Sequence, residues 1–446
     1  MRRIAIAAGA AALLGGMAAA ETPPYRPIPP GHDMPAGFAA DGGAPTREDF
    51  AAGERRLLAL LEAGDVAALR DHAWQVFAGL TAPTPEGWAV WESWYPSEVV
   101  YAGPQADPAP FAMARFSMHP ARQHGLGRPG APEPAAGASV AAAVLFNREA
   151  RNHIWENMLH DPATLPRLNA AFDRDGAALK DRSIPQFPYD AVAVKTVWDV
   201  VPAEGRRVLP VWDGGLDVAE VALTPSYPPA NWTRCVAVSA EPAPAPGPVA
   251  VTCNGHPMEV AVLSADAFYG FVITEAEVDA VREATGNKEA KAGDVAILTG
   301  LHFTTREIPN WVWATVWWHD RPDEGPFGAG RPDAVVGAWR NYRLAAAYDR
   351  DEPRAVDGGP AAAFNPYIEG KYPDGLRSNC MSCHVRAVYP RLPPKIDTFD
   401  MCGALPVTRG EASLPLDDPA LGSRTRLEFL WSILLAPRWN ADDPCG

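Results

Sequence analysis

The chain of 446 residues is long enough for two or three folded units. Its content of 47% hydrophobic and 21% charged residues is typical of a globular protein with a large core, which excludes a disordered or fibrous chain. The net charge of −15 gives no basic footprint for a phosphate backbone, so we expect no nucleic-acid partner. An anionic membrane surface is disfavoured for the same reason.

The amino-terminal segment, residues 1–20, has the three parts of a secretory signal peptide. Arg2 and Arg3 form a basic start, an apolar run follows over residues 4–17, and the alanines at 18–20 suit a signal peptidase. A retained membrane anchor is the alternative, but no segment reaches the roughly 18 apolar residues of a spanning helix. We therefore expect cleavage after Ala20, export to the periplasm or another exported space, and a protein that is not integral to the membrane.

Residues 21–185 are expected to form a Pro-rich arm and a helical region. Apolar residues at steps of three and four predict a helix over residues 47–79, with a break at Gly64 and Asp65. The same period predicts two further helices, over residues 142–159 and 162–179.

Residues 186–330 are expected to form a β-rich domain, because the apolar period changes to two. Predicted strands cover residues 192–198, 208–212, 232–238, 249–252, 258–263, 268–273 and 295–302, and residues 275–285 are expected to form one short helix. A hairpin that turns near residue 244 would place Cys235 and Cys253 opposite each other, so we predict a disulfide between them.

The segment 310–318 has the sequence NWVWATVWW. As a strand, it places Trp311, Trp313 and Trp317 on one face and Trp318 on the other. Such a wall is expected to form a sheet core, to shield a bound group from water, or to do both.

The helical period returns in residues 331–446, with helices predicted over 334–348 and 426–435. The expected fold class is therefore α+β: a helical amino-terminal region, a β-rich middle domain and a mostly α-helical carboxy-terminal domain.

The strongest motif is the sequence NCMSCH at residues 379–384, which contains C-x-x-C-H, the attachment pattern of c-type haem. Two cysteines on one helical turn can each form a thioether with a vinyl group of the porphyrin, and the next histidine can reach the iron. We therefore expect one covalent haem c bound by Cys380 and Cys383, with His384 as the proximal axial ligand.

Two alternatives for the motif are weaker. A redox disulfide between its cysteines leaves His384 unexplained. A zinc site needs a second close pair of ligands, whereas Cys402 and Cys445 are 43 positions apart in the sequence. These two cysteines are expected to form a disulfide of their own, which would tie the tail to the loop after the haem.

The sequence identifies the other groups around the expected iron less precisely. Candidates for the sixth ligand are Met401, His302 and His319, and an open, five-coordinate iron is a further alternative. The carbonyl of Leu392 or Pro393 is a candidate acceptor for the second ring nitrogen of His384. Arg377 and Arg386 are candidates to pair with the haem propionates, or else solvated surface arginines.

The motif resembles those of the c-type cytochromes. A longer pattern resembles large, exported bacterial mono-haem cytochrome c proteins: Lys195-x-x-Trp198, Gly300-Leu301-His302, Trp311-Val312-Trp313-Ala314-Thr315, the haem motif, and Phe429-Leu430-Trp431-Ser432. The helices expected around the motif predict a cytochrome c-like haem domain over residues 331–446. The longer resemblance covers roughly residues 190–435 and implies thioethers at Cys380 and Cys383, with His384 on the iron. It favours His302 over Met401 as the distal ligand.

The expected function is one-electron transfer through the single haem, with a redox partner protein. One alternative is a peroxidase-like haem enzyme with an open distal site, in which His302 or His319 is the acid–base group. A haem-based sensor or binding module is the other.

Overall fold

The computed structural model describes residues 47–83, 89–104, 141–212, 227–244, 247–348, 363–370, 376, 379–390 and 418–434. The predicted signal peptide lies outside these residues, as do Arg377, Leu392, Pro393, Met401, Cys402 and Cys445. Within the described ranges, every helix is too short or too polar to cross a bilayer.

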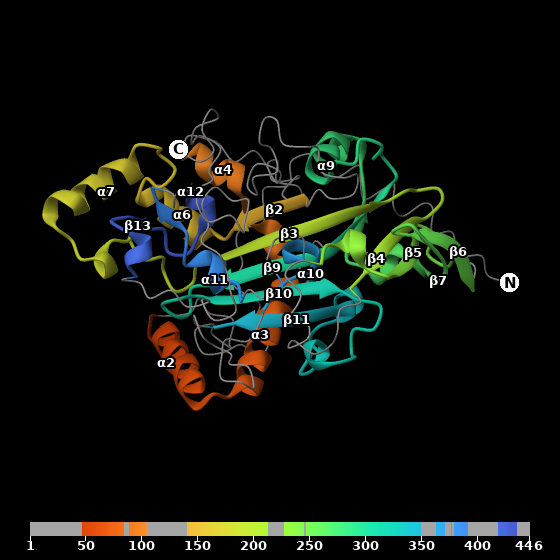
Figure 1. Ribbon diagram of the computed structural model, residues 1–446, viewed down its shortest axis with the longest axis horizontal. Helices are drawn as coiled ribbons and strands as arrows, with labels where there is room; N and C mark the ends of the chain where they lie inside the picture. Colours follow the sequence, from red (N-terminus) through yellow and green to blue (C-terminus); the bar gives the residue numbers. More distant parts are fainter. Residues whose placement is uncertain are drawn as a thin grey trace.

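The first described helices are α2 (Arg47–Ala63) and α3 (Val66–Thr81). They are separated at the predicted break, where Gly64 takes the left-handed conformation with φ +63°. The Asp65 carboxylate accepts a hydrogen bond of 3.0 Å from the Ala68 N–H and so caps α3. The buried face of α3 packs against one side of the central sheet (Figure 1).

The central sheet has seven antiparallel strands in the order β1-β2-β3-β9-β10-β11, with β8 beside β9 (Figure 1). Their bounds are β1 Tyr95–Pro96, β2 Ala141–Phe146, β3 Val192–Val201, β8 Gly270–Val272, β9 Val295–Thr305, β10 Val312–Trp318 and β11 Tyr342–Ala347. The sheet thus takes strands from both sides of residues 185 and 330, where domain boundaries were expected.

The two faces of the sheet have different partners. Val312, Ala314, Val316 and Trp318 belong to the core that includes α3, whereas Trp311, Trp313 and Trp317 belong to the core that includes the carboxy-terminal elements. The predicted division of the tryptophan segment between two faces is confirmed. Both faces of β10 are buried, which explains why the segment has no polar face.

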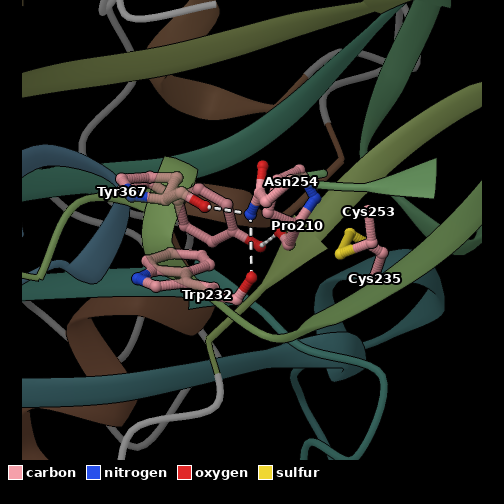
Figure 2. Close-up of a disulfide and its surroundings, with 7 residues drawn as sticks. Pro210, Trp232, Cys235, Cys253, Asn254 and Tyr367 are labelled. Carbon is pink, nitrogen blue, oxygen red and sulfur yellow. Dashed lines mark hydrogen bonds between the residues drawn. A yellow bond between two sulfur atoms is a disulfide. The ribbon is translucent and has the colours of Figure 1, made fainter. Parts of the chain in front are cut away.

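A smaller sheet has the order β4-β5-β7-β6. Its strands are β4 Arg207–Val211, β5 Arg234–Ser239, β6 Pro248–Cys253 and β7 His256–Ser264. The predicted disulfide between Cys235 and Cys253 is confirmed, with a Cα–Cα distance of 6.0 Å (Figure 2). The predicted hairpin is wrong, because β7 lies between β5 and β6 and pairs with β5 in parallel. The chain turns instead at Asn254 and Gly255, whose φ values are 48° and 87°.

The remaining longer helices are α4 Ser97–Ala102, α6 Arg148–Glu156, α7 Thr164–Asp175 and α9 Val278–Thr285. The helices expected over 162–179 and 275–285 therefore occur as α7 and α9. The helix expected over 142–159 is wrong at its start, because Ala141–Phe146 is strand β2, paired with β3. A short apolar run fits a helix or a strand, and here long-range pairing decides.

The expected fold class is wrong, because the protein is β-rich and its carboxy-terminal part is not a helical haem domain. Residues 342–347, expected to be helical, form β11 at the sheet edge. The α-helices that follow within the described ranges have four residues each: α10 Pro366–Glu369, α11 Met381–His384 and α12 Trp431–Leu434. Between α11 and α12, β12 (Val388–Tyr389) pairs with β13 (Thr425–Arg426). Pairing with β10 overrides the helical preference of the sequence YRLAAA.

Candidate haem-attachment site

The C-x-x-C-H motif forms a single helical turn that packs on the sheet face of Trp313 (Figure 1). Cys380 precedes α11, and Cys383 and His384 lie within it. Cys380 takes the left-handed conformation with φ +63°, which is strained for a residue other than glycine. Its thiol donates a weak hydrogen bond of 3.5 Å to the carbonyl of Ala363. The two cysteines are half-buried and are not joined in a disulfide.

His384 is oriented by the backbone of a distant segment. Its Nδ1 lies 2.6 Å from the carbonyl oxygen of Phe429. Because a carbonyl only accepts, Nδ1 carries the proton and Nε2 keeps its lone pair. Burial lowers the pKa of His384 to about 4, so the ring is neutral at pH 7. Phe429 thus has the role for which the carbonyl of Leu392 or Pro393, outside the described residues, was a candidate.

The segment that supplies this carbonyl is itself strained. Glu428 and Phe429 both have left-handed backbones, with φ of 49° and 66°. Arg306 anchors it by donating from Nε to the Glu428 carboxylate at 3.2 Å. Trp431, two residues further, donates from its indole to the carbonyl of Cys383 at 3.2 Å. Strained backbone therefore lies on both sides of the His384–Phe429 contact, which is typical of functional sites.

The tryptophan segment contacts the motif directly. The rings of Trp313 and His384 have their centroids 4.0 Å apart, and Trp311 lies 6.4 Å from Trp313. Trp313 is 6% exposed and Trp311 is fully buried, so the indoles exclude water from one side of the histidine.

A polar cluster lies on the same sheet face. Lys195 on β3 and His302 on β9 are directly opposite in the strand register. Nε2 of His302 lies 3.3 Å from Oε1 of Glu369, at the end of α10, and the two side chains are only 21% and 18% exposed. We call Lys195, His302 and Glu369 the polar triad.

The triad is electrostatically linked to the motif. Burial lowers the pKa of Lys195 to about 8, although the Glu369 carboxylate opposes the shift. Burial alone would raise the pKa of Glu369, but His302 and Lys195 hold it below its usual value. His302 is the register partner of Thr315, which lies two residues along β10 from Trp313, the ring that contacts His384. His302 and His384 therefore lie on the same face of the sheet, and His302 is paired with Glu369, a carboxylate that the sequence analysis did not single out.

The environment of the Cys380 thiol is unlike that of a redox dithiol. Burial, followed by the nearby Glu369 and Cys383, raises the pKa of the Cys380 thiol well above its usual value. Redox motifs of the C-x-x-C type require a thiolate with a lowered pKa. A neutral thiol, by contrast, becomes an equally neutral thioether, so haem attachment adds no buried charge at this position.

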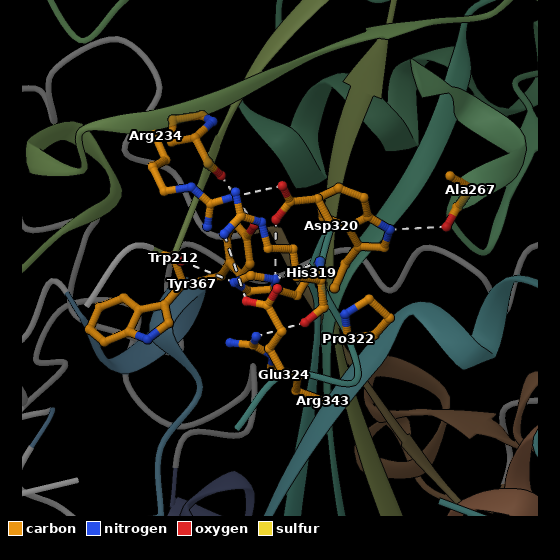
Figure 3. A network of polar contacts seen from close by, with 12 residues as sticks. Trp212, Arg234, Ala267, His319, Asp320, Pro322, Glu324, Arg343 and Tyr367 are labelled. Carbon is orange, nitrogen blue, oxygen red and sulfur yellow. Dashed lines mark hydrogen bonds and ion pairs between the residues drawn. The ribbon is translucent and has the colours of Figure 1, made fainter. Parts of the chain in front are cut away.

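His319 has a different environment from the motif. Its Nε2 donates to the carbonyl of Trp212 at 3.1 Å, and its Nδ1 accepts from the Arg321 N–H at 2.9 Å (Figure 3). Burial, and then the charge of Arg343, lowers its pKa to about 3. It follows the far end of β10, six residues from Trp313, or about 20 Å at the usual rise of a strand. His319 therefore has no nitrogen to offer an iron at this site.

Of the two arginines that were candidates for the haem propionates, Arg386 lies within the described residues. Arg386 is 1% exposed, so it is not a solvated surface arginine and its guanidinium is buried two residues beyond His384. Met401 and Arg377 lie outside the described residues.

The sequence analysis gave no role to Glu369 or to the Phe429 carbonyl, although Phe429 belongs to the longer pattern of the resemblance. Asn365-Pro366 is a typical helix start, with a capping side chain followed by proline, and could have predicted α10. For Phe429 no local signal exists, because the group that acts is a backbone carbonyl.

Among the described residues, no three histidine, cysteine, aspartate or glutamate side chains converge as a metal site. Comparisons of the chain with protein-family models, with curated proteins and with solved structures find no match.

Proposed function

We propose that the protein is an exported bacterial mono-haem c-type cytochrome that exchanges single electrons with a redox partner protein. The observation that carries this proposal is the hydrogen bond from His384 Nδ1 to Phe429, which orients Nε2 as a ligand on the same turn as two thiols. The signal-peptide pattern of residues 1–20 agrees with it, because haem is attached to c-type cytochromes outside the cytoplasm.

The residues at the site fit haem c. Cys380 and Cys383 would hold the porphyrin through thioethers, and His384 would bind the iron through Nε2. The haem supplies the one-electron chemistry when bound. The chain orients the axial ligand through Phe429 and shields it with Trp313, two means by which proteins tune a haem potential.

On the distal side, we propose His302 as the second axial ligand. Its Nε2 faces Glu369, so Nδ1 is the nitrogen available to a metal. A carboxylate on the second ring nitrogen is the usual support of a metal-bound histidine, because it fixes the tautomer and raises the basicity of the ligand.

The test is to produce the full chain in a bacterial host that matures c-type cytochromes. The purified protein should be red, and its mass should exceed that of the polypeptide by one haem. A variant with both Cys380→Ser and Cys383→Ser should carry no haem, whereas Ser382→Ala, between them, should retain it. A colourless wild-type protein with the mass of its amino acids alone would overturn the proposal.

A peroxidase-like enzyme is the second candidate, favoured by the His302–Glu369 pair, since a histidine backed by a carboxylate is also suited to acid–base catalysis. A low-spin spectrum in both oxidation states supports the carrier. A high-spin ferric form that binds cyanide and turns over peroxide supports the enzyme. His302→Ala should convert low-spin to high-spin if His302 is the distal ligand, and an unchanged spectrum contradicts that assignment.

A further inference from the structure

The helix that carries Glu369 is too short to hold its own position. α10 has four residues, and isolated helices below about 12 residues are marginal in water. Its place over the sheet must therefore come from what it packs against.

One anchor of α10 is the central sheet. The Asn365 side chain donates to the Thr315 hydroxyl at 3.0 Å and to the Val316 carbonyl at 2.9 Å. The Asn365 N–H donates to Oε2 of Glu369 at 2.6 Å, while Oε1 faces His302. Both oxygens of Glu369 are thus engaged, and the carboxylate follows any movement of α10.

The other anchor is the small disulfide-bonded sheet (Figure 2). The Tyr367 hydroxyl donates to the Pro210 carbonyl at 3.1 Å, and its ring packs edge-on against Trp232 with centroids 5.0 Å apart. The Tyr227 N–H donates to the Gly370 carbonyl at 2.8 Å, directly after Glu369.

The disulfide ties these contacts together. Pro210 on β4 is the register partner of Cys235 on β5. Asn254, the residue after Cys253, donates from its side chain to the carbonyls of Trp232 and Pro229 at 2.8 and 2.7 Å. The disulfide therefore joins β5, the neighbour of the strand that receives the Tyr367 hydroxyl, to the turn whose Asn254 supports Trp232.

We propose that the disulfide-bonded sheet β4–β7 positions the distal side of the haem by clamping α10. Tyr367, Trp232 and the Cys235–Cys253 disulfide act through Glu369 on the orientation of His302. They are positioning residues, because they act on His302 only through α10 and Glu369. This inference rests on the proposed haem function.

The test uses the full chain with its haem attached, and compares ferric and ferrous absorption spectra and the midpoint potential. Glu369→Gln sets the reference, because it weakens the carboxylate–His302 contact directly. Tyr367→Phe keeps the ring and removes only the hydroxyl. Asn254→Gly removes the side-chain hydrogen bonds but tolerates the left-handed backbone. Cys235→Ser with Cys253→Ser removes the disulfide, and Glu259→Gln, exposed on β7, is the control.

We expect the Tyr367, Asn254 and double cysteine variants to retain haem, to lose part of the low-spin bands, and to shift the potential in the same direction as Glu369→Gln. The Glu259 control should match the wild type. The inference is overturned if Tyr367→Phe and Asn254→Gly, which remove no core volume, both match the wild type, whether or not Glu369→Gln changes the spectrum. A wild-type protein without haem would instead overturn the proposed function.

Discussion

Two histidines, His319 and His384, lie at opposite ends of strand β10 and differ in how their ring nitrogens are used. His319, beyond the carboxyl end, has one nitrogen on the Trp212 carbonyl and the other on the Arg321 N–H. His384 packs on Trp313 near the amino end, where Phe429 engages Nδ1 alone and leaves the lone pair on Nε2. Both nitrogens of His319 are used in hydrogen bonds that stabilise the fold, whereas His384 keeps Nε2 oriented as a ligand.

The surroundings reinforce this difference. Around His319, Arg234 pairs with Asp320 at 2.6 Å and Arg343 donates to the Arg321 carbonyl at 2.7 Å, so both arginines bond to protein groups (Figure 3). Around His384 are two thiols, the indoles of Trp311 and Trp313, which we call the indole wall, and the polar triad. A buried histidine is thus informative about function only when the partner of each nitrogen is known.

The largest expected effect is on the haem absorption spectrum, which should change when His384 is substituted but not when His319 is. His384→Ala should remove the proximal ligand, so the attached haem should lose the low-spin bands of the wild type. His319→Ala should retain them, because its nitrogens bond only to protein groups. Absorption spectra of the two variants, made in the same host, check this. Equal spectra would contradict the assignment of His384.

The next largest expected effect is a pH dependence of the protein's stability that is caused by His319. Its folded-state pKa of about 3 lies below the ordinary 6.5, because burial and Arg343 disfavour the imidazolium. Between these values the unfolded chain binds a proton that the folded chain does not, so acid favours unfolding. The stability is fully present above pH 6.5 and is lost as the pH falls toward 3, by an amount on the order of a few kcal/mol.

Denaturant unfolding at several pH values measures how the free energy of unfolding changes with pH. His319→Asn does not titrate, so its stability should fall less between pH 6.5 and 4 than that of the wild type. An identical slope in both proteins would show that His319 is not the group responsible.

The two regions also differ in how far the sequence predicted them. Strands β3, β9 and β10 were predicted because each carries a strand-like apolar pattern over at least seven residues, and both faces of β10 are apolar. The region after residue 331 was predicted wrongly, because β11 is decided by pairing with β10 and the later helices are too short to leave a period.

The site was predictable where its chemistry is local. C-x-x-C-H is a contiguous motif, so Cys380, Cys383 and His384 could be named from it. The partners of His384 and His302 could not, because Phe429 lies 45 positions from His384 and Glu369 meets His302 only through the fold. The disulfide was predicted from a hairpin that does not exist, since Cys253 pairs with His256 across β6 and β7.

A smaller effect on stability is expected at Gly300 on β9, where the sheet contacts the side chain that anchors α10. A Cβ there would lie 2.5 Å from Nδ2 of Asn365, the group that bonds to Thr315 and Val316. Gly300→Ala should therefore push the Asn365 amide away and cost about 1–3 kcal/mol of stability.

A double-mutant cycle checks the origin of that cost. In the Asn365→Ala background the obstructing amide is absent, so Gly300→Ala should cost much less. Equal costs in both backgrounds, measured by denaturant unfolding, would contradict the steric account.

The smallest effect concerns the indole wall, where two tryptophans of one face can be compared. Trp313 contacts His384, whereas Trp317 packs on Phe327 with ring centroids 5.1 Å apart. Both substitutions to phenylalanine should cost less stability than the about 3–5 kcal/mol of a truncation to alanine. Only Trp313→Phe should also lower the haem midpoint potential, because water nearer the axial histidine favours the ferric charge. Redox titration of both variants measures this. Equal potentials would mean that Trp313 contributes packing but no shielding, and that the specialisation of this end of β10 lies in the Phe429 carbonyl and the thiols alone.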